Sequence, residues 1–253
     1  MLEEFDLTGK VAIVTGGNGG IGRGIAIGLA RAGADIVIAA RNEKKTAGVV
    51  EEITGIGRRC LGVRCDVESH DDIQAVVETA LREYGIMNIL VNNAGISAGG
   101  PPQSIPEEIW DRVLNTNLRA AFFFSQAIFP ELVKVGGGKI INIGSEYSIF
   151  GSASVLPYSA SKGGVIQLTK SLAVAWAGNN IQVNAIIPGW IRTDMTVPVI
   201  DYQPMYQEIV RRTPAGRFGE TNELAGAAVF LASSASNFIT GQSVIVDGGY
   251  SVA

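Results

Sequence analysis

Two side chains of this sequence are spaced so that they could move one proton. Tyr158 and Lys162 lie four residues apart, thirteen and seventeen residues after Ser145. Positions i and i+4 of a helix share a face, so a phenol and an ammonium at this spacing can act on the same atom. A tyrosine phenol titrates near ~10, and a neighbouring cation favours the phenolate. The pair therefore indicates acid-base chemistry on an alcohol, although a motif this short needs support from the rest of the chain.

The composition favours one α/β domain that acts on small molecules. Of 253 residues, 47% are hydrophobic, 17% are charged and 32 are glycine, which suits a parallel sheet buried on both faces. The net charge is −4 and no run of Lys or Arg exceeds two residues, so we expect neither a nucleic-acid partner nor an anionic membrane partner. No apolar run reaches the roughly 18 residues of a membrane span, and residues 1–8 carry three acids, which favours a cytoplasmic location.

Histidine and cysteine are too scarce for several other chemistries. His70 is the only histidine and follows Ser69 in a pattern typical of a helix start. A Ser-His-Asp hydrolase and a multi-histidine metal site are therefore excluded, and we predict no metal. Cys60 and Cys65 are too few and too widely spaced for a zinc ribbon or a redox pair, so they are interpreted as structural thiols.

Short apolar runs alternate with segments of helical periodicity along the whole chain. The seven predicted strands are Val11–Thr15, Asp35–Ala40, Cys60–Cys65, Ile89–Asn92, Lys139–Ile143, Gln182–Ile187 and Ser243–Val246. Helix starts are predicted at Gly20, Asn42, Ser69, Pro106 and Thr221. This alternation predicts right-handed crossovers and a doubly wound (Rossmann) seven-stranded parallel sheet with helices on both faces. We expect residues 1–253 to form one dinucleotide-binding catalytic domain.

One stretch, at about 190–213, breaks this alternation. It contains Pro198 and Pro204 together with aromatic residues and methionines, and it has no long regular period. Connections longer than about a dozen residues in compact domains are often active-site lids. We therefore expect a substrate lid here; the alternative is an excursion that only covers apolar surface.

A glycine-rich turn follows the first predicted strand. The glycines allow two registers, Gly17-x-Gly19-x-x-Gly22 and Gly16-x-x-x-Gly20-x-Gly22. We favour the second, because Thr15 and Gly16 directly end the strand. In either register, backbone without side chains can approach a pyrophosphate and present N–H groups at a helix N-terminus. No Gly-Lys-Ser/Thr follows, so a nucleotide-hydrolysing P-loop is disfavoured.

The glycine-rich turn, Asn117, Ser145 and the pair Tyr158 and Lys162 occur in the order that resembles the short-chain dehydrogenase/reductase family, over residues 10–250. The resemblance implies reversible hydride transfer between a nicotinamide cofactor and a carbonyl or secondary alcohol. Ser145 would hydrogen-bond the substrate oxygen and Tyr158 would exchange its proton. Lys162 would lower the pKa of the phenol and hold the nicotinamide ribose. Asn117 would hold a water that links Lys162 to solvent.

The end of the second strand bears on the cofactor. Alanine occupies the position where an NAD-preferring relative would have Asp, and Arg41 follows with a guanidinium suited to a 2′-phosphate. We therefore expect NADP(H) to be preferred, with NAD(H) possible through backbone contacts. The cofactor-binding residues that the resemblance implies are Gly16, Asn18, Gly20, Ile21, Gly22, Arg41, Asn42, Asp66, Val67, Asn93, Ala94, Gly95, Tyr158, Lys162, Pro188, Gly189, Ile191 and Thr193.

Within the family, the chain resembles bacterial gluconate and other sugar-acid dehydrogenases. An alternative is a 3-oxoacyl-acyl-carrier-protein reductase, but such enzymes dock their carrier with arginines where this chain has Gly136 and Asn179. A second alternative is a non-catalytic regulator that binds NADPH. The expected substrate contacts are Ser145, Glu146, Tyr147, Tyr158 and Trp190. For Glu146 two readings stay open, a contact to a polyhydroxylated substrate or a side chain facing solvent.

Two helical segments carry more apolar and small residues than one buried face requires. They are residues 117–129 and 165–177. In the family the corresponding helices form one contact between subunits, and the C-terminal segment near residues 244–250 forms a second. We therefore expect a homotetramer; the alternative is a monomer or dimer whose extra apolar residues lie under the lid.

Overall fold

The computed structural model describes residues 2–253, in which seven parallel strands form one sheet in the order β3-β2-β1-β4-β5-β6-β7. The predicted fold class is therefore confirmed, and each predicted strand is present to within one residue at either end. The strands are β1 (Val11–Thr15), β2 (Asp35–Ala40), β3 (Cys60–Arg64), β4 (Ile89–Asn92), β5 (Gly138–Ile143), β6 (Ile181–Pro188) and β7 (Ser243–Val246).

Local hydrogen bonds explain why the helices begin where the sequence predicts. The side chain of Asn42 accepts from Lys45 N at 3.0 Å, and that of Ser69 accepts from Asp72 N at 3.2 Å. Each therefore pairs a free N–H group of the first helical turn. The helices are α1 (Gly20–Arg31), α2 (Glu43–Gly55), α3 (His70–Tyr84), α4 (Glu107–Leu114), α5 (Ala120–Lys134), α6 (Leu156–Trp176), α7 (Val197–Asp201), α8 (Gln203–Arg212) and α9 (Ala225–Ala232).

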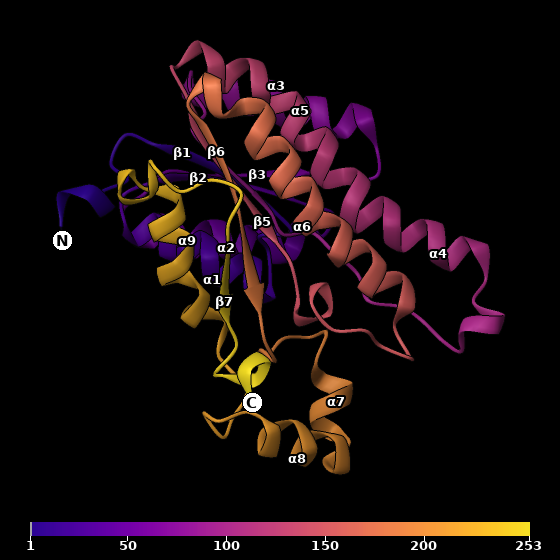
Figure 1. The fold of residues 1–253 in the computed structure, drawn as a ribbon. Helices are drawn as coiled ribbons and strands as arrows, with labels where there is room; N and C mark the ends of the chain where they lie inside the picture. The colour runs from indigo at the N-terminus through magenta and orange to yellow at the C-terminus, as the bar shows by residue number, and fades with distance from the viewer. Residues whose placement is uncertain (1) are drawn as a thin grey trace.

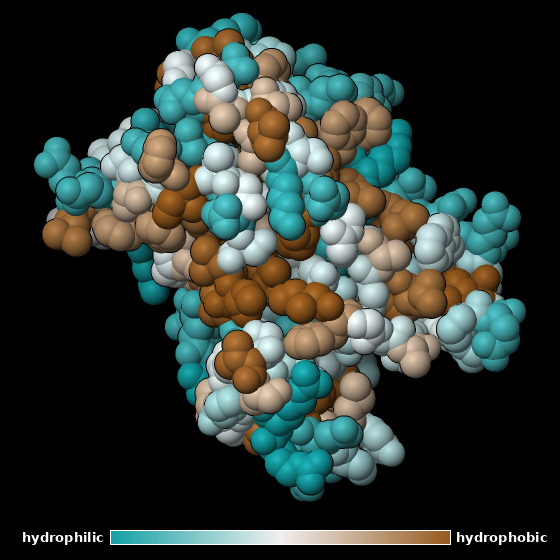
Figure 2. All heavy atoms as spheres, in the orientation of Figure 1, coloured by the Kyte–Doolittle hydropathy of each residue, from teal (hydrophilic) through white to brown (hydrophobic). Residues whose placement is uncertain are grey.

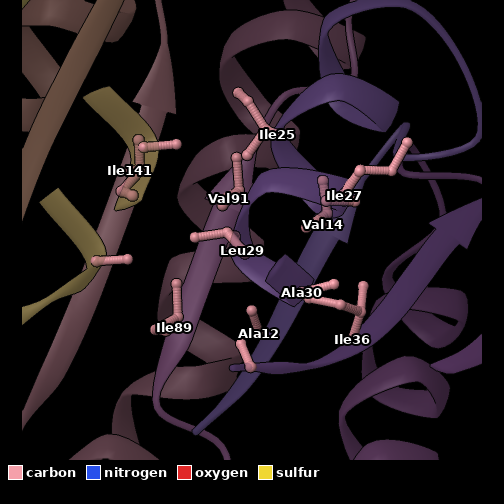
Figure 3. Close-up of a cluster of buried hydrophobic side chains, with 14 of the residues drawn as sticks. Ala12, Val14, Ile25, Ile27, Leu29, Ala30, Ile36, Ile89, Val91 and Ile141 are labelled. Atoms are coloured by element: carbon pink, nitrogen blue, oxygen red, sulfur yellow. The ribbon is translucent and has the colours of Figure 1, made fainter. Parts of the chain in front are cut away.

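Helices cover both faces of the sheet (Figure 1). One apolar core joins α1, α2 and α9 to the first face, and a second joins α3, α5 and α6 to the other. Figure 3 shows Ile25 and Leu29 of α1 among the side chains of β1 and β4, including Val14 and Val91. All four are fully buried. This packing places the start of α1 at the carboxyl edge of the sheet.

The strand order reverses between β1 and β4, which leaves a crevice at their carboxyl ends. Segments that follow β1, β4, β5 and β6 therefore meet at one edge. Helices α7 and α8 extend beyond this edge, near the C-terminus in Figure 1. None of the helices in residues 2–253 is long and apolar enough to cross a lipid bilayer.

The stretch 190–213 is more regular than its sequence suggested. It contains two helices, α7 and α8, rather than an irregular loop. Pro198 and Pro204 each lie in the first turn of one of them, where a missing N–H group costs no helical hydrogen bond. The sequence analysis found no long regular period in this stretch, whereas both prolines mark helix starts.

Candidate active site

The turn after β1 distinguishes the two glycine registers. Gly16 and Gly20 have φ angles of +62° and +50°, which side chains disfavour. A Cβ atom on Gly22 would lie 2.4 Å from both Gly16 O and Asn93 Nδ2. Gly19, in contrast, is extended and has open space where its Cβ atom would lie. The structure therefore requires glycine in the register of Gly16, Gly20 and Gly22.

The loop after β4 braces this turn. The side chain of Asn93 donates to Thr15 O at 2.9 Å and to Gly16 O at 3.2 Å. In return, the Thr15 hydroxyl accepts from the backbone N–H groups of Asn93 and Ala94, both at 3.0 Å. The two loops thus form one rigid floor at the strand-order reversal.

A cavity of about 460 Å³ lies above this floor. It brings together most of the predicted cofactor and substrate residues. These are Gly16, Asn18, Gly20, Ile21, Asn93, Ala94, Gly95, Ser145, Glu146, Tyr147, Tyr158, Lys162, Pro188, Gly189, Trp190, Ile191 and Thr193.

The other predicted cofactor residues lie outside the walls of this cavity. Arg41 is exposed just after β2, and Asn42 caps α2. Asp66 and Val67 follow β3, where an Asp66 carboxylate oxygen accepts from Glu68 N at 3.1 Å. These residues lie along the same edge of the sheet, because β2 and β3 are the next strands beyond β1.

Lys162 lies deep in the site. Its Nζ atom donates to Ile143 O at 2.7 Å and lies 5.7 Å from the centroid of the Tyr158 ring. Only 4% of the residue is exposed, and this burial lowers the pKa of Lys162 to about 8. The end of β5 and the first turns of α6 therefore hold the ammonium beside the phenol, as the spacing predicted.

The pKa of Tyr158 differs from the sequence-based expectation. Burial raises this pKa, the Ser145 hydroxyl acts to lower it, and Tyr147 raises it further. The expected lowering by Lys162 is therefore wrong for this structure, since desolvation dominates and the ammonium donates to a backbone carbonyl instead. Ser145 is the neighbour that opposes the effect of burial.

Asn117 is 3% exposed and lies in a single turn of π-helix, Asn115–Arg119, between α4 and α5. Its Oδ1 atom accepts from Ile96 N at 2.8 Å, and its Nδ2 atom donates to Ile96 O and Ser161 Oγ, each at 3.0 Å. The side chain thus fastens the loop after β4 to α6, the helix that carries Tyr158 and Lys162. A Cβ atom on Gly95 would lie 3.3 Å from Asn117 Oδ1 and 3.6 Å from Lys162 Nζ.

Glu146 does not face solvent, so the solvated side chain, one of the two readings left open by the sequence, is wrong. It is 5% exposed, and burial raises the pKa of its carboxyl group to about 8, with Asp247 raising it further and Arg212 lowering it. Next to it, the ring of Tyr147 packs edge-to-face against Tyr158 at 6.1 Å and against Trp190 at 6.4 Å. Three predicted substrate residues, Glu146, Tyr147 and Trp190, therefore form one wall beside the phenol of Tyr158.

Sequence reasoning missed several residues of the cavity. Lys45 of α2 and Asp194 both line it and form an ion pair at 2.8 Å. Lys45 lies one turn beyond Arg41 near the start of a predicted helix, so helical periodicity could have found it. Ser154 and Val155, which precede α6, also line the cavity. Nothing in their sequence indicated this position.

Comparison with known proteins identifies the family. A family profile described as enoyl-(acyl carrier protein) reductase matches residues 16–251. The 2-dehydro-3-deoxy-D-gluconate 5-dehydrogenase of Dickeya dadantii is 45% identical over 251 residues, which cover 99% of this chain and 98% of that protein. The chain belongs to the short-chain dehydrogenase/reductase family. The gluconate 5-dehydrogenase of Gluconobacter oxydans, another similar protein, is 39% identical over 249 residues, covering 98% and 97% of the two chains.

Solved structures agree with this assignment. The crystal structure of a gluconate 5-dehydrogenase from Burkholderia cenocepacia in complex with NADP and tartrate superposes with a TM-score of 0.95. It is 39% identical, with 100% of this chain and 99% of that chain covered. As a member of the short-chain dehydrogenase/reductase family, the protein is an NAD(P)-dependent oxidoreductase. The predicted family, fold and enzyme class are confirmed.

Proposed function

We propose that the protein interconverts a secondary alcohol of a sugar acid and the corresponding keto acid with NADP(H). The observation that carries the proposal is one cavity holding Ser145, Tyr158 and Lys162 together with buried polar groups on its substrate side. The similar proteins of Dickeya dadantii and Gluconobacter oxydans, named for gluconate-type substrates, support the same substrate class.

The residues present fit a dinucleotide. Gly16, Gly20 and Gly22 leave backbone free for close approach, and the N-terminus of α1 offers its N–H groups to a pyrophosphate. Gly95, Pro188, Gly189, Ile191 and Thr193 extend the site toward the catalytic residues. When bound, the cofactor supplies or accepts the hydride.

The protein side of the reaction is proton transfer and orientation. In oxidation, the Ser145 hydroxyl hydrogen-bonds the substrate oxygen while Tyr158 removes its proton; in reduction Tyr158 returns it. Lys162 holds the ribose side of the cofactor. The hydrogen bond from Ser145 opposes the effect of burial on the pKa of Tyr158 and so favours the phenolate that accepts the proton in oxidation. Both amide hydrogens of Asn117 are donated to Ile96 and Ser161, so its side chain fixes α6 and with it the position of Lys162.

The preference for NADP(H) rests on cations near the end of β2. Arg41 is exposed there, and Lys45 lines the cavity one turn further along α2. A guanidinium and an ammonium four residues apart, at the start of one helix, can both serve a 2′-phosphate. The NADP complex of the Burkholderia cenocepacia protein supports the same preference.

Initial-rate assays of the purified protein test this function. The panel contains D-gluconate, 5-keto-D-gluconate, a 3-oxoacyl thioester and unsubstituted ketones, each with NADP(H) and NAD(H). We expect turnover of a sugar acid or its keto form, faster with NADP(H) at low cofactor concentration. Turnover of the thioester alone would favour the acyl-carrier reductase instead, although exposed Gly136 and Asn179 offer no cation to an acidic carrier. Cofactor binding without any turnover would favour a regulator.

The assembly we propose is a homotetramer. Val174 of α6 is 85% exposed, Phe238 is fully exposed and Val252 is 87% exposed. Figure 2 shows further hydrophobic residues in a band across the face on which β7 lies in Figure 1. Apolar surface on two separate parts of the fold supports two isologous contacts, which close into a tetramer. Light scattering at micromolar concentration should give four times the chain mass of 26.6 kDa, and a mass near one chain would contradict the proposal.

The segment containing α7 and α8 is proposed to act as the substrate lid. It supplies Met195, Val199 and Met205 to the cavity wall, and Lys45 ties it to α2 through Asp194. Closure over the substrate would exclude water from the proton transfer. We also propose a cytoplasmic location, where Cys60 and Cys65 would remain free thiols as they are in the structure.

A further inference from the structure

Two polar atoms on the substrate side of the cavity have no hydrogen-bond partner. They are Glu146 Oε1 and Trp190 Nε1, and within residues 2–253 the only other buried side-chain atom without a partner is Asn92 Oδ1. A buried polar group without a partner destabilises the fold, so native proteins usually pair such atoms. Glu146 and Trp190 both line the cavity that holds Tyr158. Their unpaired atoms therefore indicate a ligand group that forms the missing hydrogen bonds.

The two side chains line the same cavity as Tyr158. Glu146 directly follows Ser145, and Trp190 directly follows Gly189, on the neighbouring strand ends of β5 and β6. Gly189 makes room for the carboxyl group, since a Cβ atom there would lie 3.0 Å from Glu146 Oε1. The ring of Tyr147 packs between Tyr158 and Trp190. Backbone and packing thus hold both residues in the cavity wall that also contains Tyr158.

The groups around Glu146 decide whether its carboxyl group is protonated. Asp247, after β7, and Arg212, at the end of α8, act on it with opposite signs, and the phenols of Tyr147 and Tyr250 lie close by. Arg212 itself is held by Tyr250, whose hydroxyl it contacts at 3.2 Å. Burial and Asp247 prevail, so the pKa of Glu146 rises to about 8. At neutral pH its carboxyl group keeps a proton and can both donate and accept.

We propose that Glu146 and Trp190 together bind a substrate hydroxyl on a carbon next to the reacting one. The indole N–H donates to the hydroxyl oxygen, and the hydroxyl hydrogen is accepted by the Glu146 carboxyl group. This inference rests on the proposed function and assigns the selectivity for hydroxylated substrates to Glu146 and Trp190. A site built to hydrogen-bond a hydroxyl rejects analogues that lack it far more strongly than an apolar pocket rejects a missing methylene, because its polar groups then stay unpaired.

The test compares keto substrates that differ by one hydroxyl, assayed with NADPH. One pair is 5-keto-D-gluconate and its 4-deoxy or 6-deoxy analogue; the other is 3-hydroxy-2-butanone and 2-butanone. For the wild type we expect kcat/KM to favour the hydroxylated member by at least roughly 100-fold. Glu146→Met, which removes both oxygens at similar length, should lower this ratio at least about tenfold. Glu146→Gln, which keeps a donor and an acceptor, should retain most of it.

Trp190→Phe provides a second, independent variant. It removes the indole N–H and keeps an aromatic ring against Tyr147 and Phe218. We expect the ratio to fall about tenfold here too, with NADPH affinity unchanged in a fluorescence titration. If Glu146→Met does not fold, the ratio of the two kcat/KM values measured for Trp190→Phe tests the inference. A ratio equal to that of the wild type in the folded variants would overturn the inference.

The two substrate pairs separate this inference from the proposed function. Normal turnover of 5-keto-D-gluconate with an unchanged ratio in Glu146→Met would contradict only the hydroxyl-binding role. Turnover of the butanone pair alone would contradict the sugar-acid function, while the ratio within that pair would still test Glu146. If the wild type reduces no member of either pair, both conclusions fail.

Discussion

Replacement of Glu146 by Gln should change how the stability of the protein depends on pH. An ordinary glutamate titrates near 4.5, whereas burial raises the pKa of Glu146 to about 8. Below pH 4.5 the carboxyl group is protonated in both the folded and the unfolded chain. Between these values the unfolded chain releases the proton and the folded chain keeps it. The free energy of unfolding therefore falls as the pH rises through this window.

The size of this effect follows from the displacement of the pKa. A change from 4.5 to about 8 corresponds to a loss of up to about 5 kcal/mol of stability once the pH exceeds 8. Glutamine cannot ionise, so Glu146→Gln removes this dependence and leaves that of all other groups in place. We expect the variant to match the wild type near pH 5 and to exceed it by at least about 2 kcal/mol at pH 8.5.

Urea unfolding at pH 5, 6, 7 and 8.5 measures the difference. Both proteins should be compared at one protein concentration without cofactor, because association and ligand binding shift apparent stability. Subtracting the two curves cancels the titration of Lys139 and Lys162, whose pKa values burial lowers to about 8. A difference that stays constant from pH 5 to pH 8.5 would refute the reasoning. A difference that grew toward low pH would have the wrong sign.

Three further predictions concern the catalytic group, the cofactor and the glycine-rich turn. Tyr158→Phe removes the proton donor, so turnover should fall at least roughly a hundredfold while NADPH binding persists; near-normal turnover would exclude Tyr158 as the acid-base group. Arg41→Ala should weaken NADPH binding by roughly 1.5–3 kcal/mol and leave NADH almost unaffected in parallel titrations, and equal losses would show that Arg41 does not read the 2′-phosphate. Gly22→Ala places a Cβ atom 2.4 Å from backbone and should weaken NADPH binding at least tenfold. In Gly19→Ala the added Cβ atom lies in open space, so its affinity for NADPH should stay within about threefold of the wild-type value. Similar NADPH affinities of the two variants would count against the register of Gly16, Gly20 and Gly22.

The elements of the fold could be predicted because their signals are local. The strands of the sheet are short apolar runs, and the caps Asn42 and Ser69 act on N–H groups three residues away. The spacing of Tyr158 and Lys162 places both on one helical face, independent of the rest of the fold. The two helices of the segment with Pro198 and Pro204 were not predicted, because proline disrupts a helix interior but is favoured in its first turn.

The electrostatics of the site depend on distant segments that only the tertiary structure brings together. The pKa of Tyr158 is raised because the surrounding elements exclude water, a property its neighbours in sequence do not encode. Lys45 meets Asp194 across 149 residues, and Asn117 meets Ser161 across 44. Long-range contacts of this kind arise from strand order and helix packing.

For this protein, the sequence by itself determined the family and the doubly wound sheet, and it predicted the catalytic residues, since each depends on residue types at short, regular spacings. It left two readings for Glu146, a substrate contact or a solvated side chain. The tertiary structure excludes the solvated side chain: β5 and β6 place the carboxyl group against Gly189 and near Asp247, and only 5% of the residue is exposed. Burial and the absence of a partner are properties of packed surroundings, which is the physical reason that spacing along the chain could not reveal them.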